Sequence, residues 1–200
     1  MNQDFLGIYK GRKIDTMLNI HSTITYQVIL MKKLLIIGLV STLIGCSTTS
    51  GTGARTNVSN FDGTKSVIIA PHSAACKSMI CPLLGATWLD TQPNNIGFSV
   101  ELLNEIAIIN SVAFNIDGEI IKIDAPLSTD FNQDSVAKSS RTVVVTRYIV
   151  LKKILQSKRT WMRLSTSKGN YEVAIIDGSL DSKAYNALKR FDAQVNTVKK

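Results

Sequence analysis

A short segment that begins thirty residues into the chain constrains the fold more than any other. Residues 31–33 read Met-Lys-Lys, an eleven-residue apolar run follows at 34–44, and Gly45 and Cys46 come next. A positive start, a short apolar core and a small residue at the exit are the parts of a secretory signal. As a helix the run would span roughly 16 Å, about half of the hydrocarbon core of a bilayer. We therefore expect an export signal and no stable membrane-spanning helix.

The exit tetrapeptide at 43–46, Leu-Ile-Gly-Cys, resembles the lipobox of bacterial lipoproteins. The resemblance covers residues 31–50 and implies cleavage just before Cys46, which would then carry a diacylglyceryl thioether and an amide-linked acyl chain. Two or three acyl chains hold a protein stably on a membrane, whereas one chain holds it only marginally. Because Ser47, and not Asp, follows the cysteine, the resemblance also implies the outer membrane, with the domain facing the periplasm.

The signal divides the chain into four parts. Residues 1–30 have mixed polarity and no sustained period, and we interpret them as a mis-assigned start or an extended leader. Residues 31–45 form the signal peptide, and residues 46–60, rich in Ser, Thr, Gly and Asn, form a lipidated flexible tether. Residues 61–200 then form one folded domain, which is long enough to bury its own core.

Short β-branched runs separated by turn signals predict a single α+β domain with about eight mainly antiparallel strands and two helices. Asp117-Gly118 predicts a tight hairpin turn, Pro71 is expected to end the first strand, and residues 125–138 are expected to form a loop. The expected strands lie at 66–70, 85–89, 96–102, 106–116, 119–123, 140–146, 161–165 and 171–176.

Apolar periodicity predicts the first helix, and a capping residue together with apolar periodicity predicts the second. Residues 148–156 place Leu151 and Ile154 on one face, away from the lysines. The second helix is expected after a cap at Asp181 or Ser182, because a short polar side chain accepts a free backbone N–H there. Its predicted core face consists of Ala184, Leu188, Phe191 and Val195.

Cys76 and Cys81 are the cysteines left after Cys46. The cell envelope is oxidising, so we expect these two to form a disulfide. Free thiols are one alternative, and a metal site made of His72 with both cysteines is another. The spacing of the cysteines does not match a zinc knuckle, and no second histidine follows Cys46. We predict no metal and no cofactor.

Basic residues gather in one segment of a chain whose net charge is +8. Residues 138–168 carry nine Lys and Arg residues and no acidic residue. Such a segment could bind anionic lipid, lipopolysaccharide or another acidic polymer, and the candidate residues are Lys152, Lys153, Lys158 and Arg159. Alternatively, the fold spreads these charges over several faces. Nucleic acid is not an expected partner, since no aromatic-rich binding motif accompanies the charge.

Catalytic patterns in the chain are weak. Ser135 and Lys138 fit S-x-x-K, but the companion motifs of serine acyltransferases are absent, and His72 has no evident partner. Five acids could supply the carboxylate pair of a glycosidase, namely Glu101, Glu105, Asp117, Glu119 and Asp124. We therefore expect a non-catalytic binding or scaffolding domain, with an envelope hydrolase using Ser135 and Lys138 or His72 as the alternative. The oligomeric state stays open.

Overall fold

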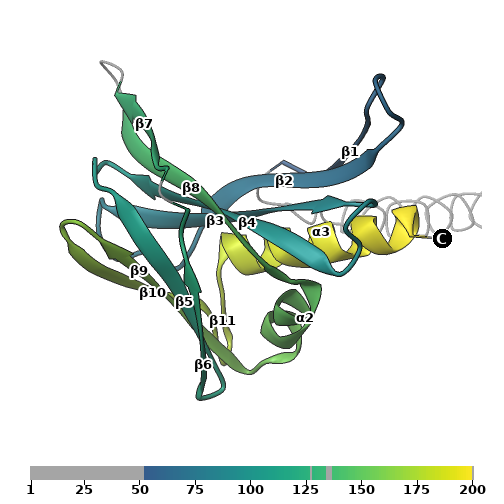
Figure 1. The fold of residues 1–200 in the computed structure, drawn as a ribbon. Coiled ribbons are helices and arrows are strands. Elements are labelled where there is room, and N and C mark those ends of the chain that lie inside the picture. The colour runs from purple at the N-terminus through teal and green to yellow at the C-terminus, as the bar shows by residue number, and fades with distance from the viewer. Residues whose placement is uncertain (1–51, 127, 134–136, 200) are drawn as a thin grey trace, which may run out of the picture. The chain divides into compact units, whose positions relative to one another are not determined.

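The computed structural model describes residues 52–126, 128–133 and 137–199. The predicted leader, the signal peptide and Cys46 lie outside these ranges. Within them the chain forms eleven strands in two antiparallel sheets, together with two helices (Figure 1). The predicted α+β class, mainly antiparallel with two helices, is confirmed.

The first sheet has six strands and holds the longest continuous ladder among the described residues, between Asn95–Leu103 and residues 139–147. Every neighbouring pair in it is antiparallel. Its strands, in spatial order, are β1 (Arg55–Val58), β2 (Lys65–Ser73), β3 (Cys81–Leu89), β4 (Asn95–Leu103), β8 (Lys138–Arg147) and β7 (Asp130–Gln133).

The second sheet has five strands and is also antiparallel throughout. The turn between two of its strands contains Asp117 with φ 49° and Gly118 with φ 100°, the left-handed pair that a two-residue hairpin requires. Its strands, in spatial order, are β11 (Leu180–Asp181), β10 (Gly169–Asp177), β9 (Arg159–Thr166), β5 (Ile109–Ile116) and β6 (Glu119–Asp124).

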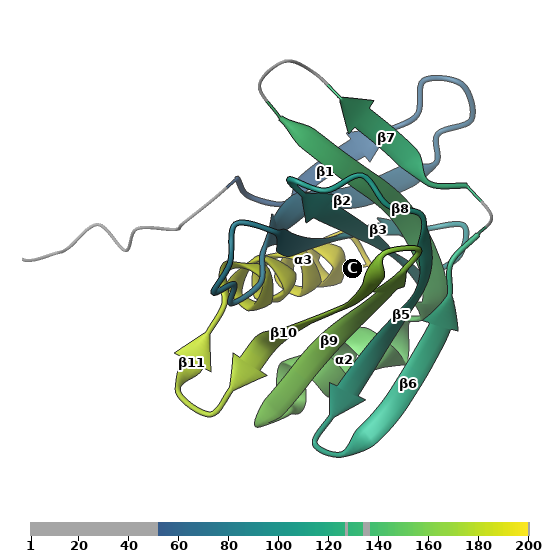
Figure 2. The same cartoon turned by 90° about the vertical axis from the view of Figure 1, so that its left-hand side faces the viewer.

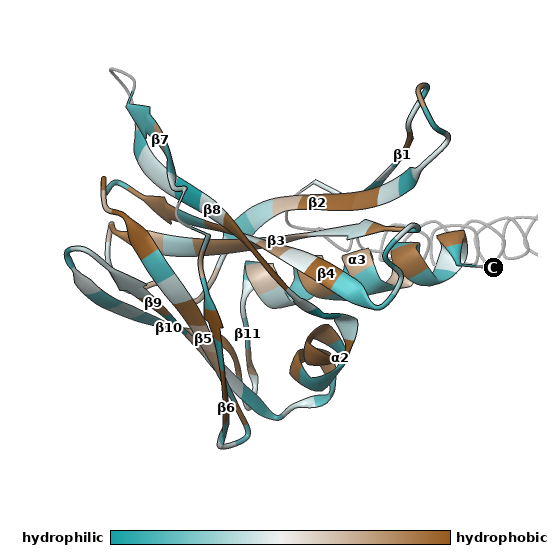
Figure 3. Ribbon diagram, viewed as in Figure 1, coloured by the Kyte–Doolittle hydropathy of each residue, from teal (hydrophilic) through white to brown (hydrophobic). Residues whose placement is uncertain are grey.

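One hydrophobic core fills the space between the two sheets and the two helices, α2 (Tyr148–Gln156) and α3 (Lys183–Val198). The sheets lie at an angle to one another, and both helices lie on the open side between them (Figures 1 and 2). Hydrophobic and hydrophilic residues alternate along several strands (Figure 3), so each sheet turns one face to this core. At its centre the rings of Phe98 and Phe114 lie 5.3 Å apart and join the two sheets.

Both helices occur where the sequence predicts them. The side chain of Ser182 caps α3 by accepting the backbone N–H of Tyr185 at 3.0 Å. All four residues of the predicted core face of α3 are fully buried, as are Leu151 and Ile154 of α2. The apolar residues that recur with the helical period of 3.6 in the sequence are therefore the ones that pack into the core.

The three strands that the sequence did not predict, β1, β7 and β11, are short, and all of their residues are exposed. Strand β1 corrects the predicted domain boundary, because the sheet begins at Arg55 and not at residue 61. Main-chain pairing with β2 holds β1, and Thr56 also accepts a hydrogen bond from Gln194 of α3 at 2.9 Å. Strand β7 likewise lies within the predicted loop at 125–138.

Strand β2 continues through Pro71 to Ser73, so the prediction that Pro71 ends the strand is wrong. The pairing of β2 with β3 shifts between Ile69 and His72, and this bulge accommodates a residue that has no N–H to donate. On β3 the bulge faces Gly85, where a Cβ would lie 2.6 Å from the carbonyl oxygen of Ile69. The two backbones approach this closely because residue 85 has no side chain.

Candidate binding surface

The outer face of the five-stranded sheet carries a row of residues that crosses the strands. Strand register places Trp161 of β9 between Asn115 of β5 and Ala174 of β10. The row continues to Ile120 of β6 on one side and, through an isolated bridge, to Ala75 on the other. Ile120 is 71% exposed, so this end of the row is open to solvent. A single large aromatic ring thus stands among small and polar neighbours.

Two hollows flank Trp161, and the size of the neighbouring side chains explains them. One has a volume of about 660 Å³ and includes Ala113, Asn115, Ile120 and Arg163 in its lining. The other, of about 340 Å³, lies against residues 75–82 and β10. Trp161 and Glu172 line both hollows. We call the two hollows together the Trp161 groove.

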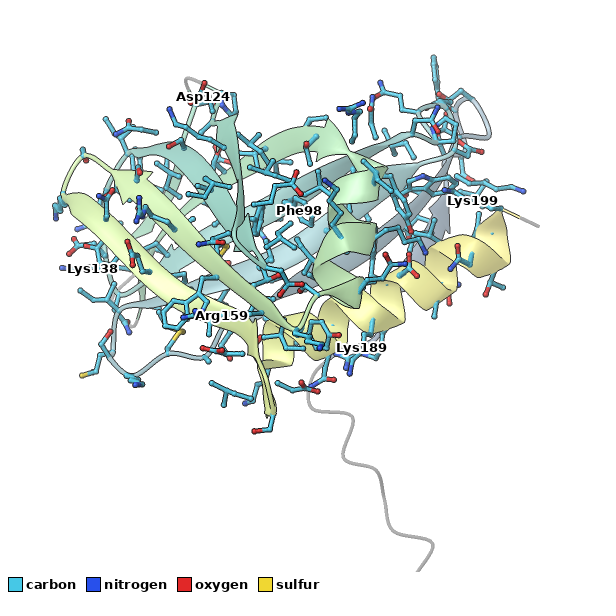
Figure 4. The ribbon with its side chains drawn as sticks, turned by 90° about the horizontal axis from the view of Figure 1, so that it is seen from below. Phe98, Asp124, Lys138, Arg159, Lys189 and Lys199 are labelled. Carbon is cyan, nitrogen blue, oxygen red and sulfur yellow. A yellow bond between two sulfur atoms is a disulfide. The ribbon has the colours of Figure 1, made fainter. Side chains whose placement is uncertain are left out.

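Ion pairs and a hydrogen bond fix the side chains of the Trp161 groove. The indole Nε1 of Trp161 donates to Oδ2 of Asp177 at 3.1 Å, and the guanidinium of Arg159 lies 5.7 Å from the ring centroid. Arg163 Nε donates to Glu172 Oε1 at 2.7 Å. Figure 4 shows Arg159 standing on the side of the sheet that is seen from below. Opposite charges therefore alternate along the groove.

The disulfide between Cys76 and Cys81 closes a loop that forms one wall of the Trp161 groove. Ala75 is held against β10 by a backbone hydrogen bond to Ala174 of 2.9 Å. On the other side of the loop, the side-chain amide of Asn104 donates to the carbonyl oxygen of Met79 at 2.6 Å. The loop is thus tied to both sheets, while Met79 itself stays 85% exposed.

Three of the four candidate basic residues are paired with a carboxylate. Lys153 pairs with Glu119 at 2.7 Å, and Arg159 lies 3.4 Å from Asp177. Lys158 is exposed beside Arg159, and no ion pair of its side chain occurs among the described residues. Over the whole basic segment 138–168, five of the nine cations pair with a carboxylate from another element or strand. The fold therefore spreads much of this charge over several faces.

The fourth candidate, Lys152, belongs to a cluster between the two helices. It lies 2.7 Å from Asp192 of α3, whose other carboxylate oxygen accepts the hydroxyl of Tyr148 at 2.7 Å. Burial and this hydrogen bond raise the pKa of the Tyr148 phenol. Burial, and next the charge of Lys152, lower the pKa of Lys199, whose Nζ lies 4.2 Å from the ring of Tyr148. These contacts join α2 to the end of α3.

His72 lies in β2, not in a loop, and its side chain is buried. Its Nδ1 lies 2.6 Å from the carbonyl oxygen of Ala70, and its Nε2 lies 3.5 Å from the guanidinium of Arg190. Nδ1 donates to the carbonyl, which leaves Nε2 as the acceptor toward Arg190. Both ring nitrogens thus contact other groups of the protein, an arrangement that suits packing better than general base catalysis.

The candidate acids lie beside cations or backbone donors, and of the pair Ser135 and Lys138 only Lys138 is described. Lys138 begins β8, while Ser135 lies outside the described residues. Asp117 accepts the backbone N–H groups of Lys158 and Arg159 at the end of the hairpin. The remaining candidate acids are matched with cations: Glu105 with Lys168, Glu119 with Lys153, Asp124 with Lys122, and Glu101 with Arg141 as its cross-strand neighbour.

The described residues contain no cluster of three or more His, Cys, Asp or Glu side chains that could hold a metal ion. In the same residues, no helix is long and apolar enough to span a membrane.

Comparison of the chain with family models, with curated proteins and with solved structures found no match. The arrangement of this chain's own residues therefore carries the functional argument. Sequence reasoning did not select Trp161 as a functional residue, because an alternating strand gives no sign of which outward residue borders a hollow. The small residues Ala113 and Ala174 could have indicated a hollow beside Trp161. Their pairing with β9, however, is known only from the strand register.

Proposed function

We propose that this chain is a lipid-anchored cell-envelope protein whose domain binds or scaffolds an envelope component and performs no chemistry. The proposed lipid anchor is supported by the tetrapeptide at 43–46, which comes at the end of a positively charged start and a short apolar run. The proposed location is the outer membrane, with the domain facing the periplasm. The disulfide between Cys76 and Cys81 is in keeping with an oxidising compartment.

Binding, rather than catalysis, agrees best with the state of the polar groups. His72 uses both ring nitrogens within the protein, and Asp117 caps backbone N–H groups of a turn. An enzyme needs a nucleophile or base within reach of a reacting atom. The two carboxylates that line the larger hollow are already engaged, Asp117 with two backbone N–H groups and Glu172 with Arg163. The Trp161 groove offers instead a rigid aromatic ring and ordered polar side chains, which suit recognition.

The anchor is tested by substituting the lipidated cysteine. Cys46→Ser is expected to leave the precursor uncut and without acyl chains, as judged by intact mass and by its release from washed membranes. The double variant Cys76→Ser/Cys81→Ser is the matched control, since it also removes thiols but should be cleaved and acylated normally. Recovery of normally processed, acylated Cys46→Ser protein would overturn the proposal.

The proposed membrane has its own test. Ser47→Asp is expected to shift the processed protein from the outer to the inner membrane in a density gradient, because the resemblance implies that Asp at this position retains a lipoprotein. Ser47→Thr serves as the control and should leave the distribution unchanged. If the wild-type protein already fractionates with the inner membrane, the location is wrong while the anchor stands.

A further inference from the structure

We infer that the Trp161 groove binds a largely uncharged glycan chain of the cell envelope, with sugar rings lying against the indole of Trp161. This inference rests on the proposed envelope function and names the ligand class of its binding surface. The volumes of the two hollows, about 660 and 340 Å³, fall in the range of sites for small organic ligands. Since Trp161 lines both, a ligand longer than one ring can pass along it.

The balance of charge in the groove points to a neutral ligand. Arg159 and Arg163 line the larger hollow together with Asp117 and Glu172, so two cations face two anions there, and Lys77 adds a single cation at the smaller hollow. Arg163 is already paired with Glu172 at 2.7 Å. An anionic polymer would have to compete with these carboxylates, whereas a hydroxyl can donate to one member of a pair and accept from the other.

The position of the groove argues against an extended peptide. A peptide that adds to a sheet needs an open strand edge, where backbone N–H and C=O groups are free. Trp161 lies on β9, which pairs with β5 on one side and with β10 on the other. The residue row therefore crosses strands whose backbones are already bonded, and recognition there depends on side chains.

The side chains present suit a sugar. The face of an indole is apolar and packs well against the C–H groups of a pyranose ring, while the planar amide and carboxylate groups reach its hydroxyls. Glu172 uses Oε1 toward Arg163 Nε, and Asn115 uses Oδ1 toward the backbone N–H of Gly118 at 3.0 Å. The second polar atom of each group, Oε2 and Nδ2, is the one that we assign to the ligand.

The loop closed by the disulfide gives the groove one firm end. Ala75 bonds to β10, and the loop lines the smaller hollow together with Trp161 and Asn170. A wall held by a covalent bond and a backbone hydrogen bond loses little freedom when a ligand binds, and this favours affinity.

The experiment uses the full chain purified in mild detergent and two probes. One is a tetramer of β-1,4-linked N-acetylglucosamine, which stands for the glycan of the cell wall, and the other is a neutral oligosaccharide released from the O-chain of lipopolysaccharide. We expect saturable binding of one of them, measured by isothermal titration calorimetry for the wild type and every variant, with a shift of the Trp161 indole N–H signal in ¹⁵N NMR where that residue is present. The affinity should persist in about 1 M salt, where the Debye length is about 3 Å.

Variants locate the site. Trp161→Ala should weaken binding by about tenfold or more, and Trp161→Phe should restore most of it, since a ring remains. Phe131→Ala is the matched control, because it removes a half-exposed aromatic ring from the other sheet, and it should bind like the wild type. The Trp88 indole signal should stay in place in every complex, because that side chain is buried.

Several results would overturn the inference. These are failure of both probes to bind, binding that disappears in high salt, equal binding by Trp161→Ala, and displacement of the indole signal by extended peptides but by neither glycan. The failure of the proposed function is a separate result, since it is read from the processing of Cys46. If the protein is acylated but binds neither glycan, the proposed lipid anchor is upheld and only the inferred glycan ligand is rejected.

Discussion

The indole Nε1 of Trp161 donates a hydrogen bond to Oδ2 of Asp177 across the β9–β10 pair, at 3.1 Å. The other oxygen of the same carboxylate lies 3.4 Å from Nε of Arg159. Register explains the arrangement, because Asp177 is the direct cross-strand partner of Arg159, and Trp161 follows two residues later on the same face. One carboxylate therefore orients both the ring and the cation beside the groove.

We predict that Asp177→Ala loosens the Trp161 ring. The indole N–H loses its acceptor, so its ¹⁵N NMR signal should shift and broaden, and the free energy of unfolding should fall by about 0.5–1.5 kcal/mol. In Asp177→Asn the amide oxygen can still accept from the indole, and only the exposed ion pair to Arg159 is lost. That control should keep the indole signal sharp. Identical indole spectra for Asp177→Ala and wild type would contradict the assigned role.

Gly85 is predicted to be intolerant of any side chain. A Cβ there would lie 2.6 Å from the carbonyl oxygen of Ile69 and 2.7 Å from the backbone nitrogen of Pro71. Since both are backbone atoms of the β2 bulge, Gly85→Ala should lower the free energy of unfolding by roughly 1–3 kcal/mol, measured by urea denaturation.

Gly97 of β4 supplies the matched control for Gly85. A Cβ there would press on a methyl group of Val143, at 3.1 Å, and that side chain is half-exposed and can move, while the carbonyl oxygen of Thr87, at 3.9 Å, is at ordinary contact distance. Gly97→Ala should change stability by less than about 1 kcal/mol, because the lost room is offset by the lower entropy of the unfolded chain. Equal effects of the two substitutions would mean that the bulge does not impose the constraint.

The sequence predicted the buried part of the fold better than its edges. The eight strands read from β-branched runs all occur, since alternation reports a face that is buried. Strands β1, β7 and β11 have no buried residue, so nothing in their composition separates them from a tether or a loop. Pro71 predicted the end of a strand, but the strand continues because the bulge opposite Gly85 accommodates the proline.

The candidate surface was harder to predict, for a related reason. The basic segment 138–168 is continuous in sequence, but α2 and β9 direct its charges to different carboxylates. Trp161 is one residue of an ordinary alternating strand, and its neighbours Asn115 and Ala174 are 46 and 13 residues away in the chain. Long-range register, which the sequence does not reveal, decides both outcomes.

We predict that removing the disulfide affects the groove as well as stability. Cys76→Ser/Cys81→Ser should lower the free energy of unfolding by about 2 kcal/mol, because the short closed loop restricts the unfolded chain. It should also raise the rate of proteolysis near Met79, which is 85% exposed. A reducing agent added to the wild-type protein should reproduce both effects, and unchanged proteolysis would show that Asn104 and Ala75 alone hold the loop.

The pair of Glu105 and Lys168 predicts a specific pH dependence. The side-chain hydrogen bond from Lys168 is the main cause that lowers the pKa of Glu105 below its ordinary value of 4.5. A carboxyl whose pKa is lower in the folded state stabilises the fold fully above the unfolded pKa, and this contribution is lost as the pH falls through the lowered value. The urea midpoint of the wild type should therefore decrease as the solution is acidified from pH 4.5 downward.

Variants of the pair isolate this contribution from other carboxyl groups. Lys168→Met removes the donor, and Glu105→Gln removes the titrating group, so both should show a shallower loss of stability over the same acid range than the wild type. The difference should be small in absolute terms, because both side chains meet solvent. The double variant should behave like either single variant, since each change already breaks the same interaction. A wild-type slope retained in Lys168→Met would assign the acid sensitivity to other carboxyl groups.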